Sequence, residues 1–321
     1  LMRAFIAPLR ISFIGGGTDM PFYYSKKDGE VISTSINKYT WVFINELKNN
    51  KLLLKYSRSE LVSDNKKIKH RLIKEILKDY KYKGLEISFF GDLPNRSGLA
   101  SSSSFTVALL AAMNRNKKNK PSKEYLAKKA CQIEIEKLGD PIGKQDQYAT
   151  SFGGLNHIIF KKKKVVVRKI IINKSFLDKF ENSISLISTG YFRSASKVLK
   201  KQSKKSEKNI HIYEEIRSLV PKFLKALKNK NLRLCGKILS KNWALKKQLD
   251  KDIYLKKFEN VEKKLNKLNV YGYKLLGAGS GGYYCVMSDN KTKMKLKKIF
   301  HKNYVNLKFD TLGAREAKII L

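Results

Sequence analysis

Apolar and polar positions alternate or recur at helical spacing along most of the chain, so both strands and helices are predicted. In the first third, the pattern predicts a strand over Ala4 to Ile14 and two more strands over 31–36 and 39–47. Apolar residues that recur every three or four positions predict a helix over 66–80. Residues 85–90 are predicted to form the next strand.

The same patterns continue through the rest of the chain, where the later helices become long and rich in lysine. An apolar run over 105–113 predicts a buried helix, and a helix over 123–138 is expected to end at Gly139-Asp140-Pro141, because glycine and proline stop helices. Further elements are expected as strands at 155–160, 165–172, 183–188, 271–276, 283–288 and near 318–321, lysine-rich helices up to 268, and a helix around 292–300. Strands and helices alternate irregularly and without a repeat, which predicts an α+β fold rather than a doubly wound parallel sheet.

Small residues crowd the segment from Pro94 to Ser104, between a predicted strand and the buried helix. Small side chains let backbone N–H groups approach an anion closely, and the positive end of the helix would complete a phosphate site. The Gly-Lys-Ser/Thr ending of a Walker A loop is missing, so another class of nucleotide site is predicted. A flexible Gly/Ser linker is the alternative, which the apolar helix directly behind the segment disfavours. The candidate cofactor-binding residues are Pro94, Arg96, Ser97, Gly98, Leu99, Ala100, Ser101, Ser102, Ser103 and Ser104.

The composition adds a strongly basic charge. The chain has 321 residues, of which 42% are hydrophobic, so it can fill a sizeable core. Its formal net charge is +41, and its 68 basic residues are mostly lysine, with only 11 arginines. The lysines occur in nearly every segment rather than in one cluster, which argues against specific nucleic-acid recognition. The excess charge would instead attract anionic small molecules such as nucleotides and sugar phosphates.

The spacing of the cysteines and the lack of long apolar runs bear on the cellular compartment in which the protein is expected. Cys131, Cys235 and Cys285 are isolated and lack metal-ligand spacing, so neither a disulfide framework nor a zinc site is predicted. The sequence has no run of about eighteen apolar residues and no apolar N-terminal leader, so neither a membrane partner nor export is expected. We therefore expect a cytoplasmic protein.

Three glycine-rich segments follow one another along the chain. The first is Pro8 to Asp19, the second is the Pro94 to Ser104 loop, and the third is Leu276 to Gly282. Together they resemble the GHMP kinases, the superfamily named for galactokinase, homoserine kinase, mevalonate kinase and phosphomevalonate kinase. Each loop alone is a weak signal, but three loops in the order and spacing of the family distinguish the match from chance. The resemblance covers essentially the whole chain.

This resemblance implies a two-domain, ATP-dependent phosphotransferase. An N-terminal domain over 1–180 would carry the ATP and catalytic motifs, and a C-terminal domain over 181–321 would complete an active site in the cleft between the two. Phosphoryl transfer needs cations on the phosphate oxygens, a cradle for the phosphates, and a carboxylate that orients or deprotonates the attacking hydroxyl. By resemblance, Gly98 to Ser104 covers the phosphates of ATP.

For a Mg²⁺ ion, the resemblance implies the Ser101 hydroxyl and the Glu134 carboxylate as protein ligands. Hard oxygen ligands of this kind suit Mg²⁺, which keeps waters and phosphate oxygens at its other positions. Glu136 is the competing carboxylate, and only one of the two can face the site, because helix residues two apart point about 200° away from each other. The spacing to Gly139 matches the family for Glu134. The alternative is that both glutamates are surface residues.

Asp146 corresponds to the catalytic aspartate of the family, and Arg10 corresponds to the basic residue beside it in sugar kinases. A cation near the aspartate would keep it ionised and could stabilise charge on the transferred group. An ordinary exposed arginine at a strand start is the alternative for Arg10. The substrate-binding residues implied are Gly16, Gly17, Thr18 and Asp19 of the first motif and Gly279, Ser280 and Gly281 of the third.

The first motif narrows the choice of acceptor sugar. Galactokinases carry Gly-Glu-His-Thr-Asp where this chain has Gly15 to Asp19 as Gly-Gly-Gly-Thr-Asp, which argues against galactose. With the segments 152–156 and 189–196, the motif looks like the D-glycero-D-manno-heptose 7-phosphate kinase group. Those enzymes phosphorylate the anomeric hydroxyl and give the 1,7-bisphosphate used for nucleotide-activated heptose and surface polysaccharide. A phosphorylated acceptor needs cationic partners. The candidates are Arg96, Lys144, Arg193 and Lys197.

Three alternatives stay open at this point. The first is a GHMP kinase for a neutral sugar, such as fucose or another hexose. The second is a non-catalytic sensor with the same fold, which the presence of Asp146 and Glu134 disfavours. The third is a basic nucleic-acid-binding module, for which steep salt-dependent binding to unrelated DNA would be diagnostic. The expected ligands are ATP, Mg²⁺ and a sugar phosphate, and the oligomeric state is left open, a homodimer included.

Overall fold

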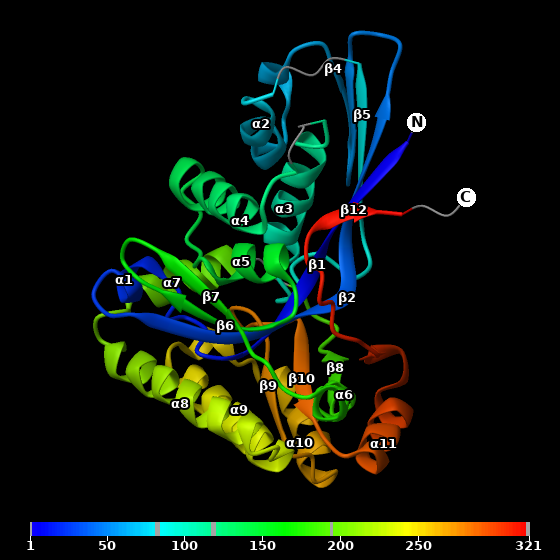
Figure 1. The fold of residues 1–321 in the computed structure, drawn as a ribbon. Helices are drawn as coiled ribbons and strands as arrows, with labels where there is room; N and C mark the ends of the chain where they lie inside the picture. Colours follow the sequence, from blue (N-terminus) through cyan, green and yellow to red (C-terminus); the bar gives the residue numbers. More distant parts are fainter. Residues whose placement is uncertain (1, 81–83, 117–119, 193–194, 319–321) are drawn as a thin grey trace.

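The computed structural model describes residues 2–80, 84–116, 120–192 and 195–318. In this part of the chain the strands form two sheets, one of eight strands and one of four, with helices packed around them (Figure 1). The larger sheet contains β1 (Arg3–Ile14), β2 (Gly29–Glu46), β3 (Leu52–Lys55), β4 (Ser59–Val62), β5 (Leu85–Gly91), β6 (Leu155–Phe160), β7 (Val165–Lys169) and β12 (Arg315–Ala317). The smaller sheet contains β8 (Ile184–Ser188), β9 (Gly272–Leu275), β10 (Tyr283–Met287) and β11 (Tyr304–Val305).

The larger sheet is organised around β2, which is long enough to pair with three other strands. Its first half pairs with β6, its second half pairs with β5, and β1 runs antiparallel along most of its length. The smaller sheet has the order β11-β8-β10-β9. Among the described strand pairs, only β3 and β5 run parallel. The predicted α+β class is therefore confirmed, because a doubly wound fold would need a mainly parallel sheet.

The helices cover both sheets and include a buried one at the centre. They are α1 (Pro21–Tyr24), α2 (Arg71–Leu77), α3 (Ser101–Met113), α4 (Lys123–Cys131), α5 (Gln145–Phe152), α6 (Lys174–Asn182), α7 (Ala195–Lys204), α8 (Ile210–Lys228), α9 (Leu232–Gln248), α10 (Glu259–Lys267) and α11 (Asn290–Phe300). A π-helical segment at Gln132–Lys137 continues α4, and single 3₁₀ turns lie at 65–67, 251–253, 256–258 and 301–303. Helix α3 packs on β1 and β2 and is apolar on nearly all sides, as its sequence predicts. No helix in the described ranges is long and apolar enough to cross a membrane.

Several boundaries differ from the sequence-based expectation. The two strands expected at 31–36 and 39–47 are one strand, β2, because the two residues between them bulge opposite the Pro8–Leu9 step of β1. The helix expected over 66–80 is confined to α2, because Ile68 is extended. The last strand expected near 318–321 is β12, three residues earlier, and residues 319–321 lie outside the described part.

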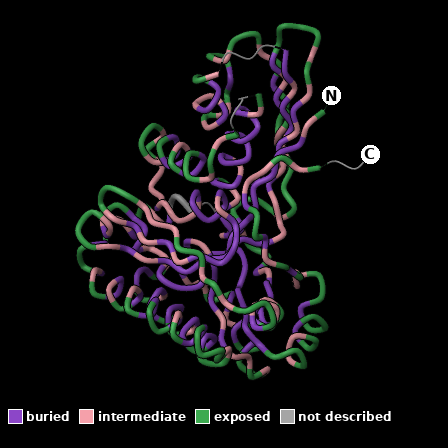
Figure 2. The backbone as a smooth tube through the Cα atoms, viewed as in Figure 1, coloured by how far each residue is buried: buried purple, intermediate pink, exposed green. Residues whose placement is uncertain are grey.

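One buried apolar cluster extends from the smaller sheet into the larger one. Leu9, Ile11 and Phe13 of β1 belong to the same buried cluster as Leu186 of β8 and Val286 of β10. A second cluster lies between α3 and the opposite half of the larger sheet. Figure 2 accordingly shows buried backbone in the upper, middle and lower parts of the molecule. The division into domains at residue 180 stays a proposal, and β12 returns from the C-terminal half to pair with β1.

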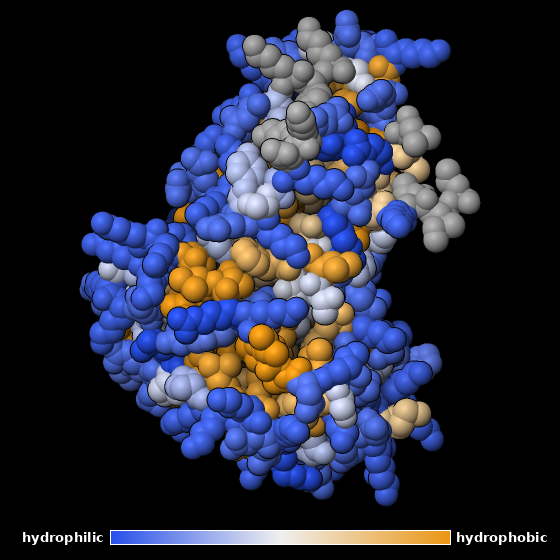
Figure 3. Space-filling model, viewed as in Figure 1, coloured by the Kyte–Doolittle hydropathy of each residue, from blue (hydrophilic) through white to orange (hydrophobic). Residues whose placement is uncertain are grey.

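The surface agrees with a lysine-rich chain of net charge +41. Hydrophilic side chains cover most of the face shown in Figure 3, and the larger apolar patches gather in its middle. Lysine or arginine occurs on each of the helices of seven residues or more except α3 and α5, as the even distribution of basic residues along the sequence predicts.

Candidate active site

The segment predicted to hold phosphate forms a loop that leads directly into α3. Arg96, Gly98 and Ala100 adopt positive φ angles of 62°, 76° and 69°, so the loop turns sharply just before the helix begins. Ala100 is the N-cap residue, and no side chain caps the first turn of α3 from this position. The positive end of a thirteen-residue helix therefore faces the loop with backbone N–H groups left for a ligand.

The four serines at the start of α3 have different environments. Ser103 and Ser104 are buried: Ser103 Oγ donates to Glu134 at 2.9 Å, and Ser104 Oγ donates to a β1 carbonyl at 2.7 Å. Ser101 is partly exposed, and its hydroxyl accepts a hydrogen bond from a loop N–H at 3.3 Å. Ser102 is exposed. The hydroxyls accessible from the surface are thus those of Ser101 and Ser102.

The third glycine motif packs behind the phosphate loop. A Cβ atom on Gly277 would overlap the backbone of Gly98, and a Cβ atom on Gly98 would lie 2.8 Å from the carbonyl oxygen of Leu276. Gly282 faces the carbonyl of Ser97 in the same way. Only glycine permits backbones to approach this closely. The third motif therefore supports the phosphate loop from behind.

The other members of the third motif are held by contacts within the C-terminal half. Gly279 packs on Ile253, and Gly281 faces the carbonyl of Tyr191. Ser280 is buried, and its N–H donates to the Ile253 carbonyl at 2.9 Å. These described contacts give Gly279, Ser280 and Gly281 a role in the shape of the loop. They do not bring the three residues to the candidate catalytic carboxylate.

The Arg10 guanidinium connects the phosphate loop to Asp146. Its Nε and Nη2 atoms lie 2.8 and 2.6 Å from Asp146 Oδ1, and its Nη1 donates to the Gly98 carbonyl at 2.8 Å. The Arg10 backbone N–H also donates to the Leu99 carbonyl at 3.0 Å. The Arg10 side chain is 4% exposed and that of Asp146 is 27% exposed. Arg10 is therefore not an exposed strand-start residue, and the carboxylate beside it is accessible to a ligand.

The first glycine motif places a buried carboxylate next to this pair. Asp19 accepts hydrogen bonds from the Gly17 N–H at 2.9 Å and from the Gln145 side-chain amide at 2.8 Å. Burial, and then the neighbouring Asp146, raise the pKa of Asp19. Thr18 is buried and its hydroxyl closes the turn by donating to the Gly15 carbonyl at 2.8 Å. The turn is thus built to hold Asp19 close to Asp146.

Glu134 is the buried carboxylate beside α3. Its oxygens accept hydrogen bonds from the Ser103 and Thr106 hydroxyls, at 2.9 and 2.5 Å, and from the Gln147 amide at 2.5 Å. Burial raises the pKa of Glu134 to about 7, although these hydrogen bonds oppose the shift. Glu136 is exposed. Of the two glutamates only Glu134 faces the interior, and the alternative that both are surface residues is wrong.

The groups around Glu134 fit a Mg²⁺ ion in their chemistry. A carboxylate and nearby hydroxyls are hard oxygen donors, and Mg²⁺ needs only one or two protein carboxylates when phosphates supply further ligands. The described residues hold no cluster of three or more His, Cys, Asp or Glu side chains of the kind that would bind a metal alone. Ser101 and Glu134 do not contact each other in the described structure, because Ser103 rather than Ser101 faces Glu134.

The structure describes only some of the residues that were predicted to bind a remote phosphate. Arg193 lies outside the described residues, as does the side chain of Lys197. The Lys144 N–H donates to the Asp19 carbonyl at 3.2 Å, and its ammonium lies 4.6 Å from the centre of the Tyr24 ring. Gln145 is a site residue that the sequence reasoning missed. Its position between Lys144 and Asp146 was the available signal.

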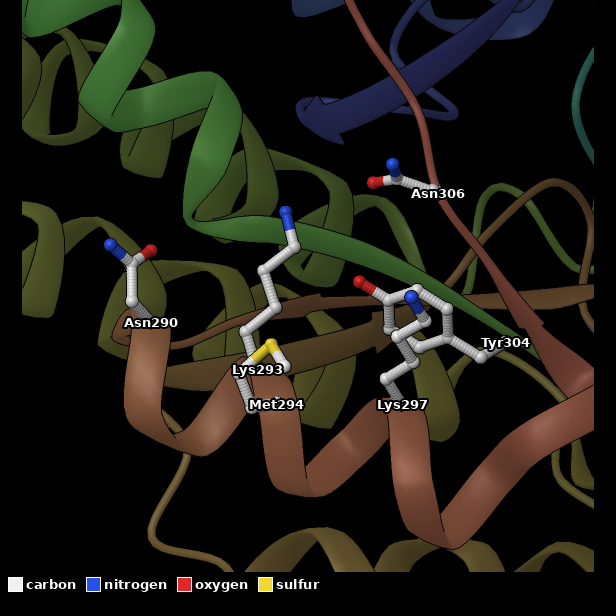
Figure 4. Close-up of a pocket in the computed structure, with 6 residues that line it drawn as sticks. All are labelled: Asn290, Lys293, Met294, Lys297, Tyr304 and Asn306. Carbon is white, nitrogen blue, oxygen red and sulfur yellow. The ribbon is translucent and has the colours of Figure 1, made fainter.

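A pocket of about 380 Å³ lies elsewhere, between α11 and β11 (Figure 4). Its lining residues are Asn290, Lys293, Met294, Lys297, Tyr304 and Asn306. Lys293 is one of two lysines that line the pocket, and its ammonium already donates a hydrogen bond to the Asn182 carbonyl at 2.8 Å. None of the predicted site residues lines this pocket.

Two family models match the chain, that of the GHMP kinases N terminal domain over residues 67–154 and that of the GHMP kinases C terminal region over 223–306. A curated D-glycero-alpha-D-manno-heptose 7-phosphate kinase from Campylobacter jejuni is 30% identical over 312 residues, which cover 92% of both chains. A galactokinase from Pyrococcus furiosus is 28% identical and covers 90% of this chain and 89% of its own.

Solved structures agree on the fold. A D-glycero-D-manno-heptose 1-phosphate kinase from Bacteroides thetaiotaomicron matches with a TM-score of 0.82 at 23% identity, over 100% of both chains. A Lactococcus lactis galactokinase complexed with galactose matches with a TM-score of 0.75 at 17% identity, over 99% of this chain and 95% of the other. These likenesses show the two-domain fold, whereas the curated relative at 30% identity shows the family. The chain belongs to the GHMP kinases and is an ATP-dependent phosphotransferase that acts on a hydroxyl group.

Proposed function

We propose that this GHMP kinase phosphorylates a sugar, and that its acceptor is the anomeric hydroxyl of D-glycero-D-manno-heptose 7-phosphate. The product would be the 1,7-bisphosphate, a precursor of nucleotide-activated heptose for surface polysaccharide. The observation that carries the reaction class is the Arg10–Asp146 pair, which is tied to the phosphate loop through the Gly98 carbonyl. The acceptor is supported by the 30% identity to a heptose 7-phosphate kinase and by the Gly-Gly-Gly-Thr-Asp motif.

In the proposed reaction the protein groups bind, orient and accept a proton. The loop from Gly98 and the first turn of α3 would cradle the ATP phosphates through backbone N–H groups. Asp146 would accept the proton of the acceptor hydroxyl, and Arg10 holds its carboxylate in place. Glu134 and a hydroxyl at the start of α3 would hold Mg²⁺, which supplies positive charge to the phosphate oxygens when bound. The remote phosphate would lie among Arg96, Lys144, Arg193 and Lys197.

A kinase for a neutral sugar is the second candidate. Galactokinases and fucokinases are found among the relatives at 23% to 28% identity over most of this chain. One solved relative is named for heptose 1-phosphate and another for galactose, so relatives of this fold differ in whether the acceptor already carries a phosphate.

The release of ADP with a panel of acceptors tests the proposal. The panel contains heptose, heptose 7-phosphate, mannose, mannose 6-phosphate, galactose, fucose and mevalonate, all at equal concentrations with ATP and Mg²⁺. We expect the highest kcat/KM with heptose 7-phosphate. Equal efficiency on heptose and heptose 7-phosphate would remove the case for a sugar-phosphate acceptor and favour the neutral-sugar kinase.

A further inference from the structure

One face of α9 connects the first and third glycine motifs. Asn242 and Lys246 lie four residues apart on this helix and are 1% and 8% exposed. Asn242 Oδ1 accepts a hydrogen bond from the Gly15 N–H at 3.3 Å, and the Lys246 ammonium donates to the Gly277 carbonyl. A helix of the C-terminal half therefore reaches the two loops that flank the phosphate loop.

The Lys246 contact is continuous with the reaction centre. Gly277 packs directly on Gly98, and the Gly98 carbonyl accepts the hydrogen bond from Arg10 that accompanies its pairing with Asp146. The buried Lys246 ammonium has one hydrogen-bond acceptor among the described residues. Because an ammonium carries three N–H groups, it retains donors for a ligand.

Other buried polar atoms around the same loops lack partners. Ser12 Oγ, Asn242 Nδ2 and Gln145 Oε1 make no hydrogen bond within the described structure. Gly16 lies beside Ser12 and Gln145, with its Cβ position 3.4 Å from Ser12 Oγ and 3.7 Å from Gln145 Nε2. Buried polar atoms are nearly always paired, so their clustering beside the first glycine motif indicates a polar ligand there.

The charges that face Lys246 come from three other elements: Arg10 of β1, Asp19 of the first glycine motif and Lys274 of β9. Burial, and then Arg10, lower the pKa of Lys246 to about 7, and Asp19 opposes the shift. Burial holds the pKa of Lys274 well below its usual range, and its ammonium donates to the Ser12 and Phe13 carbonyls at 3.1 and 2.7 Å. Lys246 is thus the lysine here whose charge would respond to an anion near neutral pH.

We propose that Lys246 binds a phosphate oxygen of the ligand and takes up a proton when that ligand binds. The proposal rests on the proposed kinase function. Two phosphates could supply the oxygen, the γ-phosphate of ATP or the phosphate that the acceptor already carries. In either case the anion favours the charged ammonium, and Lys246 would be a cation that the C-terminal half contributes opposite Arg10.

Proton uptake on binding tests this assignment without turnover. We would titrate the protein with MgADP, with a non-hydrolysable MgATP analogue, and with heptose 7-phosphate in the presence of MgADP, by calorimetry in HEPES and in Tris at pH 8. At this pH most of Lys246 is uncharged, and most of Glu134 is ionised. We expect between about one half and one proton taken up per site in the wild type. At pH 6, measured in two buffers that titrate near that pH, Lys246 already carries its proton and should take up none. Glu134 is mostly protonated there and would release its proton to Mg²⁺, so the net uptake should give way to a release.

Lys246→Met should abolish the uptake, whereas Lys241→Met, an exposed lysine on the same helix, should keep it. Uptake with the ATP analogue but not with ADP would assign the γ-phosphate. Uptake that needs heptose 7-phosphate would assign the acceptor phosphate.

No uptake by the wild type with any ligand, or equal uptake by Lys246→Met, would overturn the proposal. Where Lys246→Met does not fold, the wild-type measurement alone can still overturn the proposal. Failure of heptose 7-phosphate in the acceptor panel would instead count against the proposed substrate, since the ATP-analogue titration does not depend on it.

Discussion

Among single residues, the orientation of the Asp146 carboxylate is set by its ion pair with Arg10. Two guanidinium nitrogens of Arg10 lie within 2.8 Å of one carboxylate oxygen, which leaves Oδ2 for an acceptor hydroxyl. The two residues are 136 positions apart, so no local pattern relates them, and only the resemblance to a family predicts their meeting.

We expect Asp146→Asn to lower kcat by about 10²- to 10⁴-fold, because an amide cannot accept the proton of the acceptor hydroxyl. ATP affinity should stay within a few-fold, since in the proposed reaction the carboxylate acts on the acceptor rather than on the nucleotide. Single-turnover kinetics and nucleotide titration would measure the two effects. Asp140→Asn is the matched control, because Asp140 pairs with Arg71 at the surface. Turnover above about a tenth of wild type would rule out the role.

Glu134 should make the Mg²⁺ requirement depend on pH. Its pKa is raised to about 7 by burial, so in the proposed metal site a proton would compete with Mg²⁺ for the carboxylate below pH 7. The Mg²⁺ concentration for half-maximal activity should therefore fall as pH rises from 6 to 8. Glu134→Gln should raise this concentration and remove its pH dependence, and Glu136→Gln should do neither. If Glu136→Gln carried the metal phenotype instead, the choice of carboxylate would be wrong.

The serines next to Glu134 show where residue-level prediction stops. Glu134 faces inward and Glu136 outward, which agrees with the expectation that at most one of the two could face the site. Ser103 and Thr106 face it because they lie three positions apart on α3, whose start is set by the left-handed Ala100. Four consecutive serines carry no signal of which one faces a neighbour. The partner of Glu134 could therefore not be chosen from the sequence, and Ser101→Ala against Ser103→Ala remains the test of the metal ligand.

Among the secondary-structure elements and loops, the candidate phosphate loop and the third glycine motif are in direct backbone contact at Gly98 and Gly277. This contact fixes the position of the candidate phosphate loop. The strands and helices around them were mostly predictable, since apolar periodicity reflects burial. The bulge that joins two expected strands into β2 was not predictable, because Asn37-Lys38 is equally typical of a turn. Helix α5 was also missed, because its polar first turn carries the site residues Gln145 and Asp146. Contact between Gly98 and Gly277 depends on the whole fold and has no local signature.

Gly277→Ala should destabilise the protein and weaken ATP binding together. A methyl group there meets the Gly98 backbone at a φ of +68°, which combines a left-handed strain of about 1–2 kcal/mol with an overpacking cost of about 1–3 kcal/mol. Gly139→Ala is the control, since its φ is +64° but nothing lies within 4 Å of the added atom. Urea unfolding and nucleotide titration would compare the two variants. Equal losses of stability and an unchanged ATP affinity would contradict the support role.

In the whole molecule, the N-terminal and C-terminal halves contribute side chains to one buried apolar cluster, and the chain as a whole is strongly basic. Strand β1 supplies Leu9, Ile11 and Phe13 to the core of the smaller sheet and Arg10 to the site. The α+β class followed from the irregular order of strands and helices. The pairing of β12 with β1 did not, because the pattern of a short strand predicts the strand but not the strand beside which it lies.

The net charge of +41 should assist the capture of anionic substrates. Raising the ionic strength from about 0.05 to 0.5 M shortens the range of electrostatic attraction severalfold, so kcat/KM for ATP and for heptose 7-phosphate should fall by about tenfold. The kcat at saturation should change little. An uncharged acceptor provides the internal control, because its own kcat/KM should respond only weakly. An ionic-strength-independent kcat/KM for heptose 7-phosphate would mean that the basic surface serves another purpose.

The position of the new phosphate tests the account most directly. Heptose 7-phosphate would be incubated with the protein, ATP and Mg²⁺, and the products followed by ³¹P and ¹H NMR. The account predicts a second sugar-phosphate resonance coupled to the anomeric proton, formed in step with ADP and absent with Asp146→Asn. A phosphate on another carbon, or ADP formation without any new sugar phosphate, would contradict it.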